Sequence, residues 1–259
     1  MQNTSDLYKE LLYSTHRKEV RLTIGDTGRL IGKDGSVILF GGTSILLDTT
    51  GADNGYGEDL LVSLDTTSTM FATSTPTVGS CISSEIDIVM LQPLGEIPRQ
   101  ARLVPYVRLT DGARFSEWLQ KGVYFLDTRE IDQSSSGIEY IHMHGFDAML
   151  KTEQPYPSSQ LQWPAKDIDV VKEIANLINV PVDSRTLELM SSEYLIQYPA
   201  NYYCREVLGY IAALYAGCFV MSDLGELRLV SMYNIPPETR YLVSDNRQPI
   251  LFGGDRILV

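Results

Sequence analysis

Residues 97–150, with the sequence IPRQARLVPYVRLTDGARFSEWLQKGVYFLDTREIDQSSSGIEYIHMHGFDAML, carry the most organised β pattern of the chain. Apolar and polar side chains alternate imperfectly over residues 101–109, and a second β-rich run begins at residues 122–126. Residues 115–118, Phe-Ser-Glu-Trp, form the expected turn between these runs. The stretch shows no sequence cluster of nucleophile, base and metal ligand, so its pattern indicates a scaffold.

Residues 138–147 predict a further strand, which carries His142 and His144 two positions apart. Side chains two apart on a strand project from the same face, so the two imidazoles could begin a zinc site. A catalytic zinc normally needs a third protein ligand and a structural zinc needs four. Asp147 is the nearby candidate, across a break at Gly145. Ordinary polar strand residues are therefore the favoured interpretation.

Length and composition are those of a globular protein. The 259 residues suffice for one large domain or two ordinary ones, with a core that needs neither disulfides nor metals. Hydrophobic residues make up 44% and charged residues 21%. The 21 basic and 33 acidic residues give a net charge of −12, which disfavours adhesion to phosphate backbones or anionic lipid. A DNA-gripping role is therefore not expected, whereas DNA that slides past without sticking is compatible with this charge.

The three cysteines, Cys81, Cys204 and Cys218, form no CxxC pair, and we expect them to be buried as small apolar side chains. No run approaches the length of about 18 apolar residues that indicates a membrane-spanning helix, so no membrane anchor is expected. Residues 1–6 lack the basic and then apolar pattern of a signal peptide, which indicates synthesis in the cytosol.

The amino-terminal side of the chain predicts one helix followed by strands. Residues 4–13 place leucines and a tyrosine at helical spacing, with Thr4 or Ser5 able to cap the first turn. Residues 19–64 consist of short β runs separated by turns, which is typical of an antiparallel meander. Residues 83–90 alternate cleanly and predict a half-buried antiparallel strand.

The carboxyl side predicts two helices and a hairpin. One helix is expected from a cap at Asp167 to about residue 178, and the other over residues 203–215. Residues 218–230 then predict a β-hairpin. Residues 160–230 are therefore expected to form a small α/β block, in which both amphipathic helices bury their apolar stripes on a short sheet.

A six-residue segment near the end of the chain nearly repeats an earlier segment, and we call this pair of segments the echo. Residues 38–43 and 250–255, ILFGGT and ILFGGD, nearly repeat each other. Strand, turn and strand are expected over residues 249–259. The echo permits a second β unit that begins near residue 231 and resembles the first.

Several segments, in order along the chain, resemble the tail-hub proteins of tailed bacteriophages. These segments cover roughly residues 80–230 and are residues 84–88, 97–101, 116–119, 122–125, 145–149, 205–212 and 224–230. The resemblance is one of pattern and order, without a catalytic signature, and it is weaker over residues 1–80.

The resemblance implies a baseplate or tail-tip hub. The group includes hubs of contractile phages, tail-associated proteins of siphophages and the hub portion of type VI secretion spikes. Its members are typically trimers, and two tube-like domains in each subunit imitate a sixfold ring. The implied fold class is α+β, mainly antiparallel β, with tube-type β-barrel or sandwich domains and an inserted small α/β domain.

The implied domain division has four parts. Residues 1–18 are an amino-terminal helix or arm, residues 19–158 a first tube-like β-barrel domain, and residues 159–230 the α/β insert of two helices and a hairpin. Residues 231–259 are strands that start, or form part of, a second tube-like domain. Because the sequence stops at Val259, no carboxy-terminal peptidase, lysozyme or receptor-binding extension is expected.

The implied function is that of a structural virion component, a hub that joins the tail tube to the tip and lines the DNA channel. No catalytic residue and no cofactor are implied. The implied partners are further copies of the chain, as a trimer, together with a tail tube or distal tail protein and a tail-tip, fibre or spike protein. DNA would pass without specific binding. The protein would be made in the host bacterial cytoplasm and located in the virion tail.

Two alternatives remain beside the hub. One is a metal-dependent hydrolase that uses His142, His144 and Asp147. The other is a carbohydrate-binding host-adhesion module, since the 15 tyrosines and two tryptophans have rings that can stack on sugars. These aromatic residues are scattered along expected strands and helices, so core packing is the favoured use for most of them.

Overall fold

The larger part of the chain is described by the computed structural model. The described residues are 4–25, 39–40, 43–44, 55–71, 74–91, 97–133, 137, 139–190, 194–232, 251–252 and 255–256.

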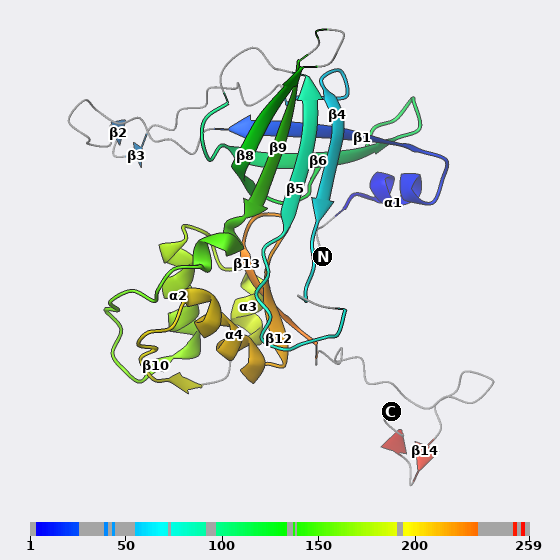
Figure 1. Cartoon of the computed structure of the whole chain (residues 1–259). Helices are drawn as coiled ribbons and strands as arrows, with labels where there is room; N and C mark the ends of the chain where they lie inside the picture. The colour runs from blue at the N-terminus through cyan, green and yellow to red at the C-terminus, as the bar shows by residue number, and fades with distance from the viewer. Residues whose placement is uncertain are drawn as a thin grey trace.

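One antiparallel sheet dominates the first half of the chain (Figure 1). Its strands are β1 (Arg17–Gly25), β4 (Leu61–Thr67), β5 (Glu85–Leu91), β6 (Arg102–Thr110), β7 (Leu119–Gln120), β8 (Tyr124–Gln133) and β9 (Glu139–Asp147). They follow the order β1-β6-β8-β9-β5-β4, and β7 pairs with β6. The predicted run over residues 83–90 is β5, and the two runs of the opening stretch are β6 and β8.

The sheet bends sharply between β6 and β8. These strands pair only at Arg102 with Phe125 and at Leu103 with Tyr124, and β6 then runs across the other strands together with β1 (Figure 1). Beyond the ladder, Leu22 and Tyr56 exchange two backbone hydrogen bonds of 2.8 and 2.7 Å. No ladder among the described residues closes the sheet into a barrel. The predicted α+β, mainly antiparallel class is confirmed.

Strand alternation builds the core of this sheet. In β5, Ile86, Ile88 and Met90 are buried while Glu85 and Asp87 face outward, as the period of two predicts. Buried side chains from the neighbouring strands and from the segment before β6 complete the cluster: Leu22, Ile24, Ile97, Ala101, Leu103, Tyr124, Leu126, Ile141 and Met143.

The predicted amino-terminal helix is α1 (Asp6–Leu12). The hydroxyl of Ser5 accepts a hydrogen bond from the Tyr8 N–H at 3.0 Å, which is the usual chemistry of a helix N-cap. Leu11 is fully buried, and the helix contacts β6. The helix thus covers part of its own sheet.

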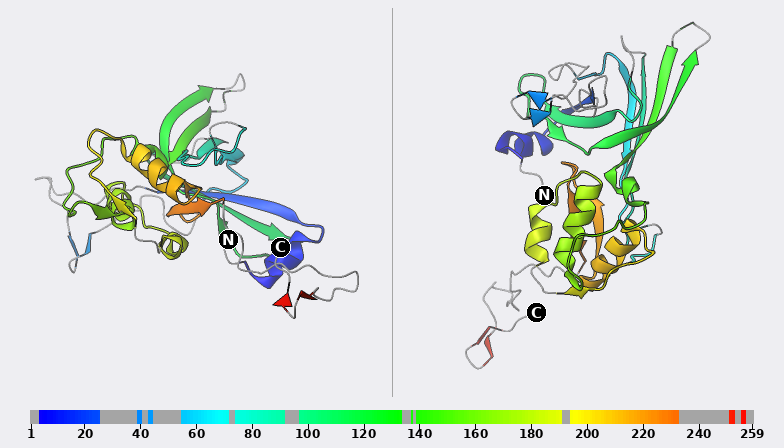
Figure 2. Two further views of the ribbon diagram at one scale, coloured as in Figure 1. Left: turned by 90° about the horizontal axis from the view of Figure 1, so that it is seen from below. Right: turned by 90° about the vertical axis from the view of Figure 1, so that its left-hand side faces the viewer.

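The second half of the chain forms a mixed layer of helices and short strands (Figures 1 and 2). Its elements are the 3-10 helix η1 (Ala148–Thr152), β10 (Ala165–Lys166), α2 (Asp167–Leu177), α3 (Ser184–Leu189), β11 (Leu195–Ile196), α4 (Cys204–Leu214), β12 (Gly217–Met221) and β13 (Leu227–Ser231). The predicted helices are α2 and α4, and the predicted hairpin is β12–β13.

The sequence predicted two helices in this layer, whereas the structure has three α-helices there, α2, α3 and α4. The third helix, α3, has only six residues and follows a Val-Pro-Val segment, so it carries no apolar period long enough to recognise. Its N-cap is Asp183, which accepts from the Arg185 N–H at 2.9 Å. The predicted cap Asp167 is instead the first residue of α2, where its carboxylate accepts from the Ile168 N–H at 2.8 Å.

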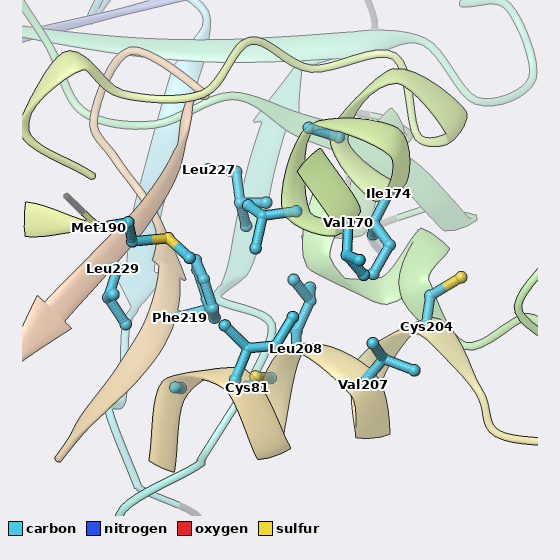
Figure 3. Packing of buried hydrophobic residues seen from close by; sticks show 14 of the residues in the cluster. Cys81, Val170, Ile174, Met190, Cys204, Val207, Leu208, Phe219, Leu227 and Leu229 are labelled. Carbon is cyan, nitrogen blue, oxygen red and sulfur yellow. The ribbon is translucent and has the colours of Figure 1, made fainter. Parts of the chain in front are cut away.

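A second hydrophobic core holds this layer together (Figure 3). Phe219 of β12 is fully buried and belongs to one cluster with residues of α2, α4 and β13. Cys81, Met149 and Tyr156 belong to the same cluster although they precede residue 159. The domain boundaries expected from the sequence stay a prediction.

Backbone contact joins α4 to the segment before β5. A Cβ atom on Gly209 would lie 2.7 Å from the carbonyl oxygen of Gly79, and Gly79 itself has a φ of +79°. Gly209 is required for the close approach of the two backbones. Gly79 is required for the same approach and also for its left-handed conformation.

The two echoing segments form matching short ladders. Strands β2 (Leu39–Phe40) and β3 (Thr43–Ser44) pair in the same antiparallel register as β14 (Leu251–Phe252) and β15 (Asp255–Arg256). The rest of residues 233–259 lies outside the described residues, so the proposed second β unit stays a prediction.

Candidate assembly surfaces

The two histidines lie on the outer face of β9, where the strand pattern places them. Nδ1 of His144 lies 2.7 Å from Oδ1 of Asp87, and Nε2 of His142 lies 3.5 Å from Oδ2 of Asp132. Asp147 is an odd number of residues from both histidines, so it projects from the opposite face. The structure therefore does not bring His142, His144 and Asp147 together. Throughout the described part of the chain, no group of three His, Cys, Asp or Glu side chains could hold a metal ion.

Asp147 instead joins two elements at the end of β9. Its carboxylate accepts hydrogen bonds from the N–H groups of Ser84 and Met149, both at 2.9 Å, and its own N–H donates to the Ser84 carbonyl. The side chain is 3% exposed, and burial raises its pKa while the two N–H donors oppose that shift. Asp147 thus ties β9 to the start of β5 and caps η1.

The turn at residues 115–118 packs on the outer face of β1 and β6. Two guanidinium groups lie over the Trp118 ring: the Cζ atom of Arg21 is 4.8 Å from the ring centroid and that of Arg108 is 4.5 Å from it. Arg108 also donates to Glu19 at 2.7 Å. Such cation–π stacking orders long side chains over a strand pair. The prominence of the turn in the sequence therefore corresponds to an ordered surface layer.

The same turn fastens the amino-terminal helix. The Glu117 carboxylate accepts hydrogen bonds from the N–H of Ser5 at 2.7 Å and from its hydroxyl at 2.5 Å. The Ser116 hydroxyl accepts from the Leu109 N–H at 2.9 Å. Sequence periodicity could not reveal the two contacts between Ser5 and Glu117, because these residues are 112 positions apart.

Several strand edges carry backbone groups that no described strand pairs, among them those of β4 and β8. Strand β4 ends the sheet, so one side of it has no neighbour among the described strands, and Val62 on this strand is 60% exposed. Strand β8 is open on its β6 side from Thr128 to Gln133, because the last backbone bond there is from the Leu126 N–H to the Ala101 carbonyl. Figure 2 shows the β8–β9 pair projecting beyond the body of the sheet. Open edges of this kind are templates for pairing with another chain.

Exposed tyrosines are frequent in the helical layer. Five of them fall within residues 194–210, and each is more than two-fifths exposed: Tyr194, Tyr198, Tyr202, Tyr203 and Tyr210. Tyr202 and Tyr210 meet edge to face with ring centroids 5.5 Å apart. The interpretation of the aromatic residues as scattered core residues is therefore incomplete. Their frequency between residues 194 and 210 is the sequence signal for these exposed rings, which we call the tyrosine surface.

The three cysteines are all buried as free thiols, as expected. Burial raises the pKa of Cys81 to about 12 and that of Cys204 to about 11, which suppresses the reactive thiolate. We expect native protein to show no fast reaction with a thiol reagent such as dithiobisnitrobenzoate, and urea-unfolded protein to release three equivalents. A thiol that reacts at once in the native state would contradict the burial of these residues.

In the part of the chain that the structure describes, no helix is long and apolar enough to cross a membrane. The described residues thus define an α+β protein with a bent antiparallel sheet, a helical layer and open strand edges that include those of β4 and β8.

No protein-family model and no curated protein matches the chain. Among solved structures, it is similar to the 43 kDa tail protein of prophage MuSo2 from Shewanella oneidensis, with a TM-score of 0.48 and 12% identity over 88% of this chain and 59% of that chain. A tail protein from Neisseria meningitidis MC58 gives a TM-score of 0.47 and 12% identity over 85% of this chain and 53% of that one. A Francisella PdpA–VgrG complex gives 0.39 and 9%, over 89% and 35%.

The chain thus spans between half and three-fifths of the length of the two tail proteins. These structures are of the kind that the sequence resemblance names. With identities of 12% or less and TM-scores below 0.5, the likeness carries no conclusion about activity or partners.

Proposed function

We propose that the chain is a structural component of a phage-type tail, a hub that joins the tail tube to the tip and lines the DNA channel. The observation that carries the proposal is the open edge of β4, which ends the sheet and exposes Val62. An uncovered strand edge with an exposed apolar side chain supports association between copies of a chain, since backbone hydrogen bonds and apolar burial act together there. The work of such a protein lies in its interfaces.

Two further features support this proposal. The segment order along residues 84–230 resembles tail hubs, and the net charge of −12 keeps DNA from adhering to a channel wall. A threefold ring is the expected assembly, because a hub must match a hexameric tube to a threefold tip. We propose no catalytic residue for this role.

We expect purified protein to form trimeric rings that bind to the ends of tail tubes, as observed by mass photometry and electron microscopy. The Val62→Lys variant should shift the population to monomer, because a lysine on an edge strand places a charge where apolar contact is needed. Leu187→Lys on α3 is the matched control, since Leu187 is also exposed but lies on a helix and not on a strand edge. Monomeric wild-type protein that leaves tubes undecorated would contradict the hub.

The tyrosine surface favours carbohydrate binding as the second candidate function. Exposed aromatic rings provide flat apolar faces for sugars, and their hydroxyl groups can form hydrogen bonds. Tyr203 and Tyr210, more than half exposed, are the rings with the most free surface in this group. The hypothesis of a metal-dependent hydrolase, by contrast, has no support from the structure, because His142, His144 and Asp147 do not lie together.

A further inference from the structure

Two adjoining hollows lie beside the open edge of β8. The first has a volume of about 720 Å³ and is lined in part by Arg99, Arg129 and Lys151. The second has a volume of about 400 Å³, is lined in part by Arg102, and shares Phe125 and Lys151 with the first. We call these two hollows together the basic groove.

Within the described residues, the cations of the basic groove form no ion pair, whereas several cations outside it do. Arg108, Arg185 and Arg205, for example, each form an ion pair. Within the described residues, no carboxylate pairs with the four cations of the groove: Arg99, Arg102, Arg129 and Lys151. Four unpaired cations in one groove are unexpected in a chain with a net charge of −12.

Two of these cations are already oriented. The Lys151 ammonium lies 3.4 Å from the centroid of the Phe125 ring, and the surrounding protein partly desolvates it, which lowers its pKa. Arg129 donates one hydrogen bond to the Ile97 carbonyl at 2.5 Å, so the remaining donors of its guanidinium are available. Both side chains are therefore held where an incoming anion would meet them.

The backbone next to the groove offers a second kind of contact. The register of β8 with β9 shifts between Leu126 and Thr128, and this bulge leaves Asp127 out of the ladder at the point where β6 departs. From Thr128 onward, the β6 side of β8 presents N–H and C=O groups that no described strand pairs. An extended peptide added there would complete the ladder.

The walls of the groove also contain apolar surface. Phe125, Phe146 and Leu150 line it together with the cations. A ligand that alternates acidic and apolar residues matches both kinds of wall, since strand side chains alternate between faces. A nucleic acid would leave the strand edge unused. Asp127, which also lines the groove, opposes any anionic ligand and so does not distinguish the two.

We propose that the basic groove binds an extended acidic segment of a partner polypeptide, which adds as a strand to the open edge of β8 and sets its carboxylates against the four cations. This goes beyond the tail role and does not require it. Carboxylates on arginine form charge-assisted hydrogen bonds, and the strand edge fixes the direction and register of the segment.

A fluorescein-labelled peptide of alternating glutamate and valine, titrated with the full chain in a fluorescence anisotropy experiment, tests this proposal. We expect saturable binding, a loss of about tenfold in affinity for Arg99→Glu and again for Arg129→Glu, and little change for Lys172→Glu. Lys172 lies on α2 outside the groove, and its substitution changes the net charge equally. The glutamine version of the peptide should bind at least about tenfold more weakly.

A peptide methylated on alternate backbone nitrogens separates strand addition from simple charge attraction. We expect it to lose most of its affinity, because it cannot donate to β8. Equal binding of the methylated peptide, equal loss for all three variants, or no binding up to roughly 1 mM would overturn the proposal. Tighter binding of oligothymidylate would do so too, in favour of a phosphate site.

The oligomeric state of the wild-type protein and of the Arg129→Glu variant is measured in a separate experiment. Trimer formation that Arg129→Glu abolishes would show that a second copy occupies the groove, which would also overturn the proposal of a different partner. Peptide binding by a chain that stays monomeric would leave the groove intact and contradict only the hub.

Discussion

Replacing Phe219 by alanine is expected to lower the free energy of unfolding by about 3–5 kcal/mol. Phe219 is fully buried on β12 and packs in the cluster that joins α2, α4 and the β12–β13 hairpin (Figure 3). Truncation removes the transfer energy of the ring and leaves a cavity that the surrounding strands and helices can fill only in part. Most of the stability of this layer is therefore expected to be lost.

Urea unfolding measures this effect, with tryptophan fluorescence as one probe, since Trp163 packs against the same cluster. Leu224→Ala is the matched control because Leu224 lies in the turn of the same hairpin but is 52% exposed. Its cost should stay within about 0.5 kcal/mol. A Phe219→Ala cost as small as that of Leu224→Ala would contradict the second core.

Replacing Asp147 by alanine is expected to cost about 2–4 kcal/mol. The substitution removes the acceptor of two backbone N–H groups, those of Ser84 and Met149, in a place where water does not reach them freely. Asp147→Asn retains one side-chain oxygen and should cost an intermediate amount. Chemical denaturation of the three proteins at one pH gives this ranking.

His144→Ala is the matched control for Asp147→Ala, because the metal interpretation groups the two residues. His144 contacts Asp87 at the surface of the sheet, so its loss should cost only about 0–1 kcal/mol. Equal costs for the two substitutions, together with stoichiometric zinc in the purified protein, would support a metal site. A large cost for Asp147→Ala alone supports the structural role.

The raised pKa of Asp147 gives the same experiment a pH dependence. The folded state retains a proton on this carboxyl at pH values where the unfolded chain, with an ordinary pKa of 3.8, has lost it. The contribution of this group to stability therefore falls as the pH rises from that value through the folded pKa. Asp147→Asn should remove this part of the pH dependence.

Local patterns were sufficient to predict most of the elements. The alternation of Ile86, Ile88 and Met90 specifies a strand with one buried face, and the apolar stripe of residues 203–215 specifies a helix. Both patterns are formed by residues close together in the sequence, so they can be recognised without knowledge of the rest of the chain. The short helix α3 escaped prediction because six residues are too few for a period to stand out.

The candidate surfaces could be predicted only in part. The spacing of the two histidines is enough to predict that they lie on one face of a strand. It is not enough to predict the face of Asp147, because a break in the strand at Gly145 could have changed it. The structure keeps β9 regular through this glycine, with Gly145 paired to Leu126, and the period of two then places Asp147 inside. The basic groove could not be inferred, because residues 99 and 102, residue 129 and residue 151 come from three separate segments.

The opening stretch, residues 97–150, shows where local and long-range information divide. Its side-chain alternation alone specifies strands β6, β8 and β9, because each strand needs one apolar face for burial. That alternation does not show that β6 leaves β8 after two residue pairs, with β7 beside β6 at Tyr106 and Val107 instead. This departure leaves one edge of β8 without a paired strand and opens the basic groove beside it. Only the folded chain determines which strand edges are unpaired.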